Sequence, residues 1–355
     1  MNLQSTICTV ATGLLSATLS AMPSFAGGLE VGVSSEAILF QPGRYAEFNY
    51  ANARPSVDGV LGPTVIPNIG GNLTFLQGGI KTGIGKRLDL ALQVREPIQL
   101  NVAYPINPAL GPLSGLTAEL DAVSLRLLAR YRINRAFSII GGLRYQSAAG
   151  EFFFGPGRTT LERDGAFGFT AGAAYEDAQK GFRATLIYQS EINHKNETTS
   201  ALAGRTVVTQ STPRSIALSA RARIAPRTFA FGRIHWSDSD SANLSIDNSI
   251  TGNIARSDFR DTWRFDLGFG KRISKKLTMN ISGSWQNGNG EPAGNIFPTN
   301  GRTSLEVGAR IHVNPKLELT GSIGYSWIGD ATAVSGARFE DNNSLLYRSG
   351  VAIRF

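Results

Sequence analysis

The feature that most limits how this chain can fold is a period-two alternation of polar and apolar residues after Gly43. Residues 304–313 alternate without a break, and residues 215–224 and 344–355 do the same. Successive side chains of a β-strand point to opposite faces, so each of these segments has one apolar and one polar side. The sequence therefore predicts an all-β fold, although alternation alone does not distinguish lipid from a protein core as the apolar surroundings.

The connections between these segments alternate between short turns and long polar stretches. Short turns lie at 85–87, 134–135, 177–180, 225–227, 274–276 and 314–316, whereas Gly-, Pro- or Asn-rich stretches lie at 105–115, 155–164, 196–204, 237–258 and 287–300. Short turns at one end and long loops at the other are typical of outer-membrane barrels. We therefore predict that residues 44–355 form a transmembrane antiparallel β-barrel of about fourteen strands, closed so that no strand edge faces lipid.

The aromatic residues support lipid as the surrounding solvent. All four tryptophans lie a similar distance along the chain from the nearest short turn: Trp236, Trp263, Trp285 and Trp327. A tilted strand climbs roughly 25 Å over about ten residues, which is the height of the apolar band of a barrel. We expect the tryptophans to form an outer aromatic girdle with Tyr145, Tyr188 and Tyr347. Beside the short turns we expect an inner girdle of Tyr131, Phe137, Phe182 and Phe229.

The N-terminus predicts export. Residues 1–26 have an apolar core and end in Ser24-Phe25-Ala26, which is the pattern of a secretory signal peptide. The single cysteine, Cys8, lies inside it, so we expect an exported chain without disulfides or cysteine-ligated metals. Residues 27–43 then form a short N-terminal segment, and 37–40 are too apolar for a solvated tail. We expect residues 29–40 to form a small plug in the lumen, and the protein to reside in the outer membrane.

Arginines dominate the face opposite the apolar one. They are Arg126, Arg130, Arg144, Arg183, Arg221, Arg233, Arg264, Arg310 and Arg348. Inward placement is expected in any barrel, because charges are costly on the lipid side. Two interpretations stay open: a polar network with Glu306, Asp266 and Glu318, or binding of a ligand carboxylate, which guanidinium groups hold bidentately. For the second, the candidate residues are Arg126, Arg144, Arg264 and Arg348.

Several stretches, in their order and spacing, resemble the FadL-type outer-membrane transporters of hydrophobic compounds. They lie at 45–50, 55–59, 95–98, 102–105, 125–132, 141–146, 188–194 and 211–213. The resemblance implies a fourteen-stranded barrel that carries long-chain fatty acids or similar apolar molecules by diffusion. The family's longer N-terminal hatch with an Asn-Pro-Ala element is absent here, so residues 27–43 would be a reduced hatch.

The resemblance also implies where ligand is captured. In the family, loops of the first half form an apolar docking groove, so the loops 105–115 and 155–164 are expected to do so here. We name Leu110 and Leu113 as substrate-binding residues beside Ile106. The C-terminal Phe355 matches the aromatic residue by which the barrel-assembly machinery recognises outer-membrane barrels.

The third strand, near 88–104, contains an anomaly. Counting by two, Leu90, Leu92 and Val94 face lipid, and the count continues through Ile98, Leu100 and Val102. This register would place Glu96 in hydrocarbon, and Pro97 cannot donate a ladder hydrogen bond. One explanation is a kink that opens the lateral window known from the family; the other is that Glu96 reaches the outer interface. The window's rim would be Arg95, Glu96, Pro97, Ile98 and Gln99.

Other functions lack support in the sequence. His194, His235 and His312 lie on different strands without ligand spacing, so no metal site or cofactor is expected. No nucleophile elbow is present, and the arginines are spread rather than clustered, so we expect neither an enzyme nor a nucleic-acid-binding protein. The expected partners are outer-membrane lipids, a hydrophobic small molecule and the barrel-assembly machinery, with a monomeric barrel. Two functions remain: a transporter of hydrophobic compounds, or an anion-preferring porin with an arginine-lined lumen.

Overall fold

The structure, a computed structural model, describes residues 36–154, 157–200, 204–242, 245–248, 252–256, 260–288 and 290–355. The predicted signal peptide, residues 1–26, and the N-terminal segment up to residue 35 lie outside the described residues. No helix in the described part of the chain is long and apolar enough to cross a membrane.

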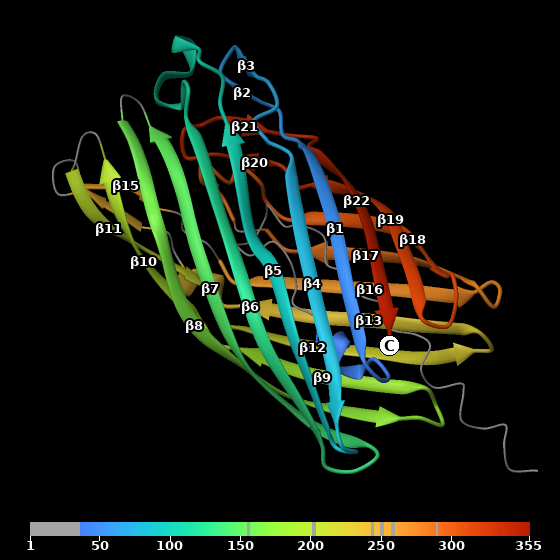
Figure 1. Cartoon of the computed structure of the whole chain (residues 1–355). Helices are drawn as coiled ribbons and strands as arrows, with labels where there is room; N and C mark the ends of the chain where they lie inside the picture. Colours follow the sequence, from blue (N-terminus) through green and yellow to red (C-terminus); the bar gives the residue numbers. More distant parts are fainter. Residues whose placement is uncertain are drawn as a thin grey trace, which may run out of the picture.

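Fourteen antiparallel strands close into one barrel, as predicted (Figure 1). In order around the barrel they are β1 (Tyr45–Ser56), β4 (Leu73–Ile84), β5 (Leu88–Ala103), β6 (Thr117–Arg132), β7 (Phe137–Phe154), β8 (Gly157–Asp177), β9 (Phe182–Gln189), β12 (Ser215–Ala225), β13 (Thr228–Ser237), β16 (Thr262–Arg272), β17 (Leu277–Gln286), β18 (Arg302–His312), β19 (Leu317–Ile328) and β22 (Asn343–Arg354). The first and last strands pair along their whole length, from Tyr45 opposite Arg354 to Ser56 opposite Asn343, which closes the wall.

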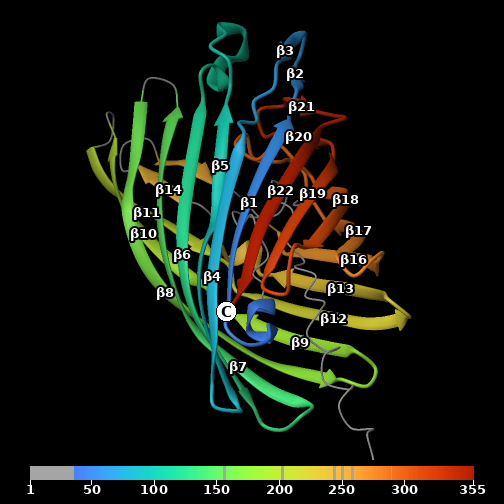
Figure 2. The ribbon, with the colours of Figure 1, turned by 45° about the vertical axis from the view of Figure 1, so that its right-hand side comes forward.

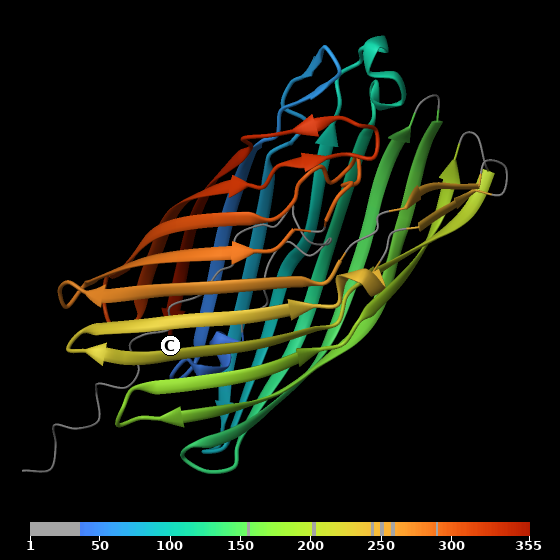
Figure 3. The same cartoon turned by 180° about the vertical axis from the view of Figure 1, so that it is seen from behind.

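The barrel end with the long connections is called the loop end below, and the end with the six short turns is called the turn end. Further elements lie at the loop end. The hairpin of β10 (Ile192–Ser200) and β11 (Gly204–Thr212) extends the wall beside β8, and β14 (Ser245–Asn248) and β15 (Gly252–Arg256) continue it (Figure 3). A small sheet combines β2 (Gly59–Leu61), β3 (Thr64–Ile66), β20 (Ala331–Thr332) and β21 (Arg338–Phe339). The 3₁₀ helices η2 (Pro108–Leu113) and η3 (Ser239–Ala242) also lie at the loop end, whereas η1 (Ala37–Phe40) lies at the turn end (Figure 2).

The barrel wall is taller at β5–β8, whose strands are longer than those on the other side. On β6 the outward positions Leu125 and Leu127 are exposed and apolar, but higher on the strand Glu119 and Asp121 point outward. Asp121 pairs with Arg163 of β8 at 2.9 Å. Outward ion pairs need water, so the upper parts of β5–β8 rise above the lipid band.

This height explains a wrong prediction. Residues 155–164 were expected to form a long loop, but β8 begins at Gly157 and pairs with β7 from Phe154–Gly157 to Ala148–Asp164. Their polar composition resembles a loop because this stretch of strand stands in water on its outer face. Residues 196–204, also expected as loop, contain the ends of β10 and β11 for the same reason.

The aromatic girdles largely follow the prediction. Trp263, Trp285 and Trp327 point outward and are about half exposed, while Trp236 is more buried and donates its Nε1–H to Asp261 at 3.0 Å. Phe229 is a wrong prediction, because it is only 4% exposed and lies on the same face of β13 as the buried Arg233. Nearness to a turn suggested the girdle, but the two-residue period decides which face Phe229 occupies.

Phe355 is positioned at the turn end, where its ring is 65% exposed and shares the lipid face with Tyr347 and Ile353. Its backbone N–H donates to the carbonyl of Arg44 at 3.2 Å. Because the ring contributes little to a packed core, its deletion should leave barrel stability nearly unchanged. We expect deletion of Phe355 to lower the amount of assembled barrel much more than deletion of one loop residue does. The fraction that migrates faster unboiled than boiled measures assembly, and normal assembly without Phe355 would contradict its role as a recognition residue.

Candidate functional site

The third barrel strand, β5, carries a bulge at the predicted anomaly. Arg95 lies opposite Ser124 of β6, but Ile98 lies opposite Ala122, so Glu96 and Pro97 together face the single residue Val123. Two residues opposite one is the definition of a β-bulge, and Pro97 fits the unpaired position because it has no N–H. The expected break in the ladder is therefore present.

The extra residue reverses the faces of the rest of the strand. Ile98, Leu100 and Val102, which a simple count by two placed toward lipid, are buried inside the barrel. The prediction was wrong because a one-residue insertion shifts every later side chain to the other face. Gln99 and Asn101 point outward instead, at a height where the wall is already polar.

Between β4 and β5 the backbone ladder stops at the bulge. It runs from Ile84–Leu88 to Gln77–Arg95 and resumes with the amide of Gly71, which donates to the carbonyl of Asn101 at 2.9 Å. Across the interval, called the β4–β5 gap below, side chains replace the missing carbonyls. Glu96 Oε2 accepts from the amide of Leu76 at 2.8 Å, and Gln99 Oε1 accepts from the amide of Thr74 at 3.0 Å. The wall is thus sealed here by two side chains.

The loop end of the lumen contains an apolar core. This cluster of buried side chains, called the outer apolar cluster below, lies beside buried polar side chains such as Gln146, His194 and Asn196. Its larger members are Val57, Ile66, Ile69, Ile98, Leu100, Val102, Tyr104, Leu110, Leu113, Leu116, Leu120, Phe152, Leu161, Val208, Ile296, Phe297, Ile328 and Phe339. Three of them, Ile98, Leu100 and Val102, belong to the strand that borders the β4–β5 gap.

The predicted docking residues have different environments in this cluster. Leu110 and Leu113 of η2 are fully buried, at 0% and 1% exposed, whereas Ile106 is 90% exposed. The neighbouring Tyr104 donates its hydroxyl to the carbonyl of Asn295 at 2.7 Å, and burial raises the pKa of this phenol. The loop at 105–115 is therefore packed onto the loop end, with one apolar side chain left facing water.

The middle of the lumen is polar and largely charge-paired. Arg348 reaches both carboxylate oxygens of Glu306 at 2.9 and 3.0 Å, and Arg264 donates twice to Asp266 at 2.7 and 2.9 Å. Arg310 lies 3.4 Å from Glu318. Glu306, Asp266 and Glu318, the carboxylates predicted for a polar network, thus each pair with an inward arginine.

The other two candidate arginines are also engaged. Arg144 donates to the carbonyl of Ser190 at 3.2 Å. Arg126, 1% exposed, pairs at 2.7 Å with Glu36, which precedes η1. All four candidates therefore lie in the lumen on β6, β7, β16 and β22, and each already has a protein partner.

The segment around η1 lies in the lumen at the turn end (Figure 2). Ile38 and Leu39 are buried against Tyr45, Leu128 and other inward residues. Lys81 Nζ donates to the carbonyls of Gln41 and Gly43 at 2.8 and 3.1 Å. The Phe40 ring lies between the guanidinium groups of Arg130 and Arg183, at 4.0 and 4.1 Å from its centroid. Residues 36–41 are called the η1 segment below.

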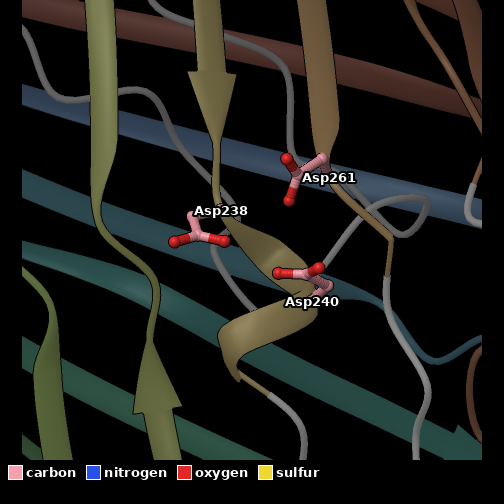
Figure 4. Close-up of side chains that lie close together, drawn as sticks. All are labelled: Asp238, Asp240 and Asp261. Carbon is pink, nitrogen blue, oxygen red and sulfur yellow. The ribbon is translucent and has the colours of Figure 1, made fainter.

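Three carboxylates lie close together at the loop end, two just after β13 and one just before β16 (Figure 4). Asp238, Asp240 and Asp261 bring one oxygen each within 4.8 Å of one another. Asp238 is held in an ion pair with Arg214, and Asp261 accepts the Trp236 indole hydrogen bond. These interactions account for two of the three carboxylates without a bound ion.

Comparisons with known proteins place this architecture. No family model matches the sequence, and no curated protein does. Among solved structures, a FadL homologue of Pseudomonas aeruginosa matches with a TM-score of 0.73 and 12% identity, covering 90% of this chain and 92% of that one. The chain has the FadL-type transporter fold.

Two other structures agree with this FadL-type fold. The toluene transporter TbuX of Ralstonia pickettii matches with a TM-score of 0.68 and 13% identity over 94% of this chain and 97% of that one. The toluene transporter TodX of P. putida matches with a TM-score of 0.68 and 9% identity over 90% and 92%. The FadL-type barrel is therefore matched over nearly its whole length.

Proposed function

We propose that this protein is an outer-membrane channel for the passive uptake of hydrophobic compounds such as long-chain fatty acids. The observation that carries the proposal is the continuity between the outer apolar cluster and the β4–β5 gap, which share Ile98, Leu100 and Val102. An apolar molecule leaving water gains roughly 25 cal/mol for each Å² that it buries, so this cluster favours its entry. The FadL-type fold and the toluene transporters among its structural neighbours support the same class of substrate.

The exit in this proposal is lateral. The rim residues Arg95–Gln99 border the one interval where side chains, not backbone, join β4 to β5. Two side chains can rotate away without breaking a continuous ladder, so widening here needs less rearrangement than elsewhere in the wall. The lower edge of the gap, at Glu96, lies beside the outward apolar side chains of Val94 and Val123. Ligand would pass from the outer apolar cluster through this edge into the membrane.

The η1 segment acts in this proposal as the reduced hatch within residues 27–43. It is held by the Glu36–Arg126 ion pair and by Phe40 between two arginines, at the end where the lumen opens to the periplasm. A plug at the turn end directs ligand sideways instead of straight through the barrel.

The alternative is an anion-preferring porin. The observation in its favour is the surplus of inward arginines over carboxylates on β9 and β12, where Arg183 and Arg221 lie opposite each other. A porin requires a continuous aqueous path, and an apolar cluster at the loop end disfavours one.

The docking loop gives a first test. Replacing both Leu110 and Leu113 with Asp places two carboxylates in an apolar environment, which should detach η2 from the outer apolar cluster. We expect uptake of labelled oleate by cells to fall several-fold while the amount of heat-modifiable barrel is unchanged, because the wall does not depend on η2. Replacing the exposed Ile106 with Asp is the matched control for added charge alone. Unchanged oleate uptake in the double variant would place docking outside this loop.

A further inference from the structure

Two arginines face each other across neighbouring strands of the lumen wall. Arg183 of β9 and Arg221 of β12 are directly opposite in register. Like charges in this position repel and are destabilising unless something neutralises them. On β8 the residue opposite Arg183 is Glu176, but its carboxylate pairs with Arg130 of β6.

Arg183 and Arg221 differ from several other lumen arginines in lacking a carboxylate partner. Arg126, Arg264, Arg310 and Arg348 each pair with a carboxylate. Within the described residues, neither Arg183 nor Arg221 has a carboxylate within ion-pair distance, and the Arg183 guanidinium lies over the Phe40 ring. Glu176 and Glu36, the carboxylates beside this pair, are already paired with Arg130 and Arg126.

A cavity lies beside this unneutralised pair. Its volume is about 60 Å³, which leaves room for a group larger than one water molecule. Arg183, Arg221 and Arg233 line it together with Glu36, whose carboxylate pairs with Arg126. The hydroxyl-bearing Thr185 and Ser219 line the same cavity, as does the Phe231 ring. The cavity thus combines hydrogen-bond donors and a net positive charge, three arginines against one glutamate, with an apolar wall formed by Phe40 and Phe231.

We propose that Arg183 and Arg221 form a subsite for the carboxylate head of an amphipathic ligand, with its apolar chain against Phe40 and Phe231. A carboxylate here would accept charge-assisted hydrogen bonds from both guanidinium groups and remove the repulsion between them. The inference rests on the proposed uptake of hydrophobic compounds and goes further, because it selects ionised amphiphiles over neutral ones. It also differs from the sequence-based candidates, which are the arginines that already have protein partners.

The test compares ligands that differ in the head group. Binding of laurate, dodecanol and acetate is measured on the purified barrel in nanodiscs, with empty nanodiscs subtracted. For the double variant Arg183→Gln, Arg221→Gln we expect laurate affinity to fall about tenfold or more, because two charge-assisted contacts are lost, and dodecanol affinity to stay within about twofold. Arg221→Gln alone, which leaves Phe40 with both of its arginines, should show part of the laurate effect.

Arg223→Gln is the matched control, because this exposed arginine of β12 lies at the turn end and bonds the carbonyl of Gln179. Removing like charge should not weaken the barrel, so heat-modifiable migration is expected to be normal in all variants. Unchanged laurate affinity, or an equal loss for dodecanol, would overturn the subsite while leaving the transport function standing. Acetate binding as tight as laurate would show a free-anion site and also overturn it. Absence of both laurate and dodecanol binding to the unmodified protein would overturn the transport function itself.

Discussion

Cross-linking residue 74 to residue 99 is expected to stop uptake of long-chain fatty acids. Thr74 and Gln99 face each other across the β4–β5 gap, where the Gln99 side chain accepts the Thr74 amide hydrogen bond at 3.0 Å. In Thr74→Cys, Gln99→Cys, a short reversible thiol cross-linker would hold the gap at its closed width. Because the only natural cysteine is Cys8, inside the predicted signal peptide, the exported protein would carry no competing thiol. We expect oleate uptake to fall to the background of cells without the protein, and a reductant to restore it.

The matched control places the same link where the ladder is intact. Ile80 and Leu92 are paired residues of β4 and β5 below the gap, and both point outward. Cross-linked Ile80→Cys, Leu92→Cys should take up oleate normally. Full uptake by the cross-linked 74–99 variant would show that ligand leaves the barrel by another route.

Replacing Glu36 with Ala is expected to open the turn end of the barrel to ions. The variant leaves the buried guanidinium of Arg126 without its carboxylate, since the two side chains are 1% and 6% exposed in the ion pair. Breaking a buried pair in this way costs about 3 kcal/mol or more, which raises the undocked fraction of the η1 segment roughly a hundredfold. In planar bilayers we expect anion-preferring current steps that the unmodified protein shows rarely.

Glu340→Ala is the control for this variant, because Glu340 is an exposed carboxylate at the loop end. It should behave like the unmodified protein in the same bilayers. If Glu36→Ala also remained electrically silent, the η1 segment would not be what closes the lumen.

The sequence predicted the barrel well because two physical periods repeat along the whole chain. Alternation fixes which side chains of a regular strand face lipid, and the alternation of short turns with long loops fixes the strand number. The inward arginines and their carboxylates followed from the same rule, as Arg348 with Glu306 and Arg264 with Asp266 show.

The remaining errors arise where the local pattern departs from a regular strand surrounded by lipid. One extra residue at Glu96-Pro97 turned Ile98, Leu100 and Val102 inward, and the sequence shows the proline without showing the shift in register. Residues 157–164 form a strand in water, which has the composition of a loop. The pairing of Arg126 with Glu36 depends on where the N-terminal segment lies, and no period in the sequence reports that.

The sequence predicts that Arg183 and Arg221 face inward, but it does not predict that they lie opposite each other. Both were recognised as inward residues, but their register depends on the length of the β9–β12 connection, which includes the β10–β11 hairpin. Knowing that register was necessary to see that two like charges face each other without a carboxylate.

The most direct test of the transport proposal measures oleate transfer and ionic current on the same purified, unmodified protein. In proteoliposomes the account predicts saturable transfer of oleate into the lipid, with no steady open-channel current in planar bilayers, because the outer apolar cluster and the η1 segment interrupt the aqueous path. A steady, large anion current without oleate transfer would contradict it and identify a porin.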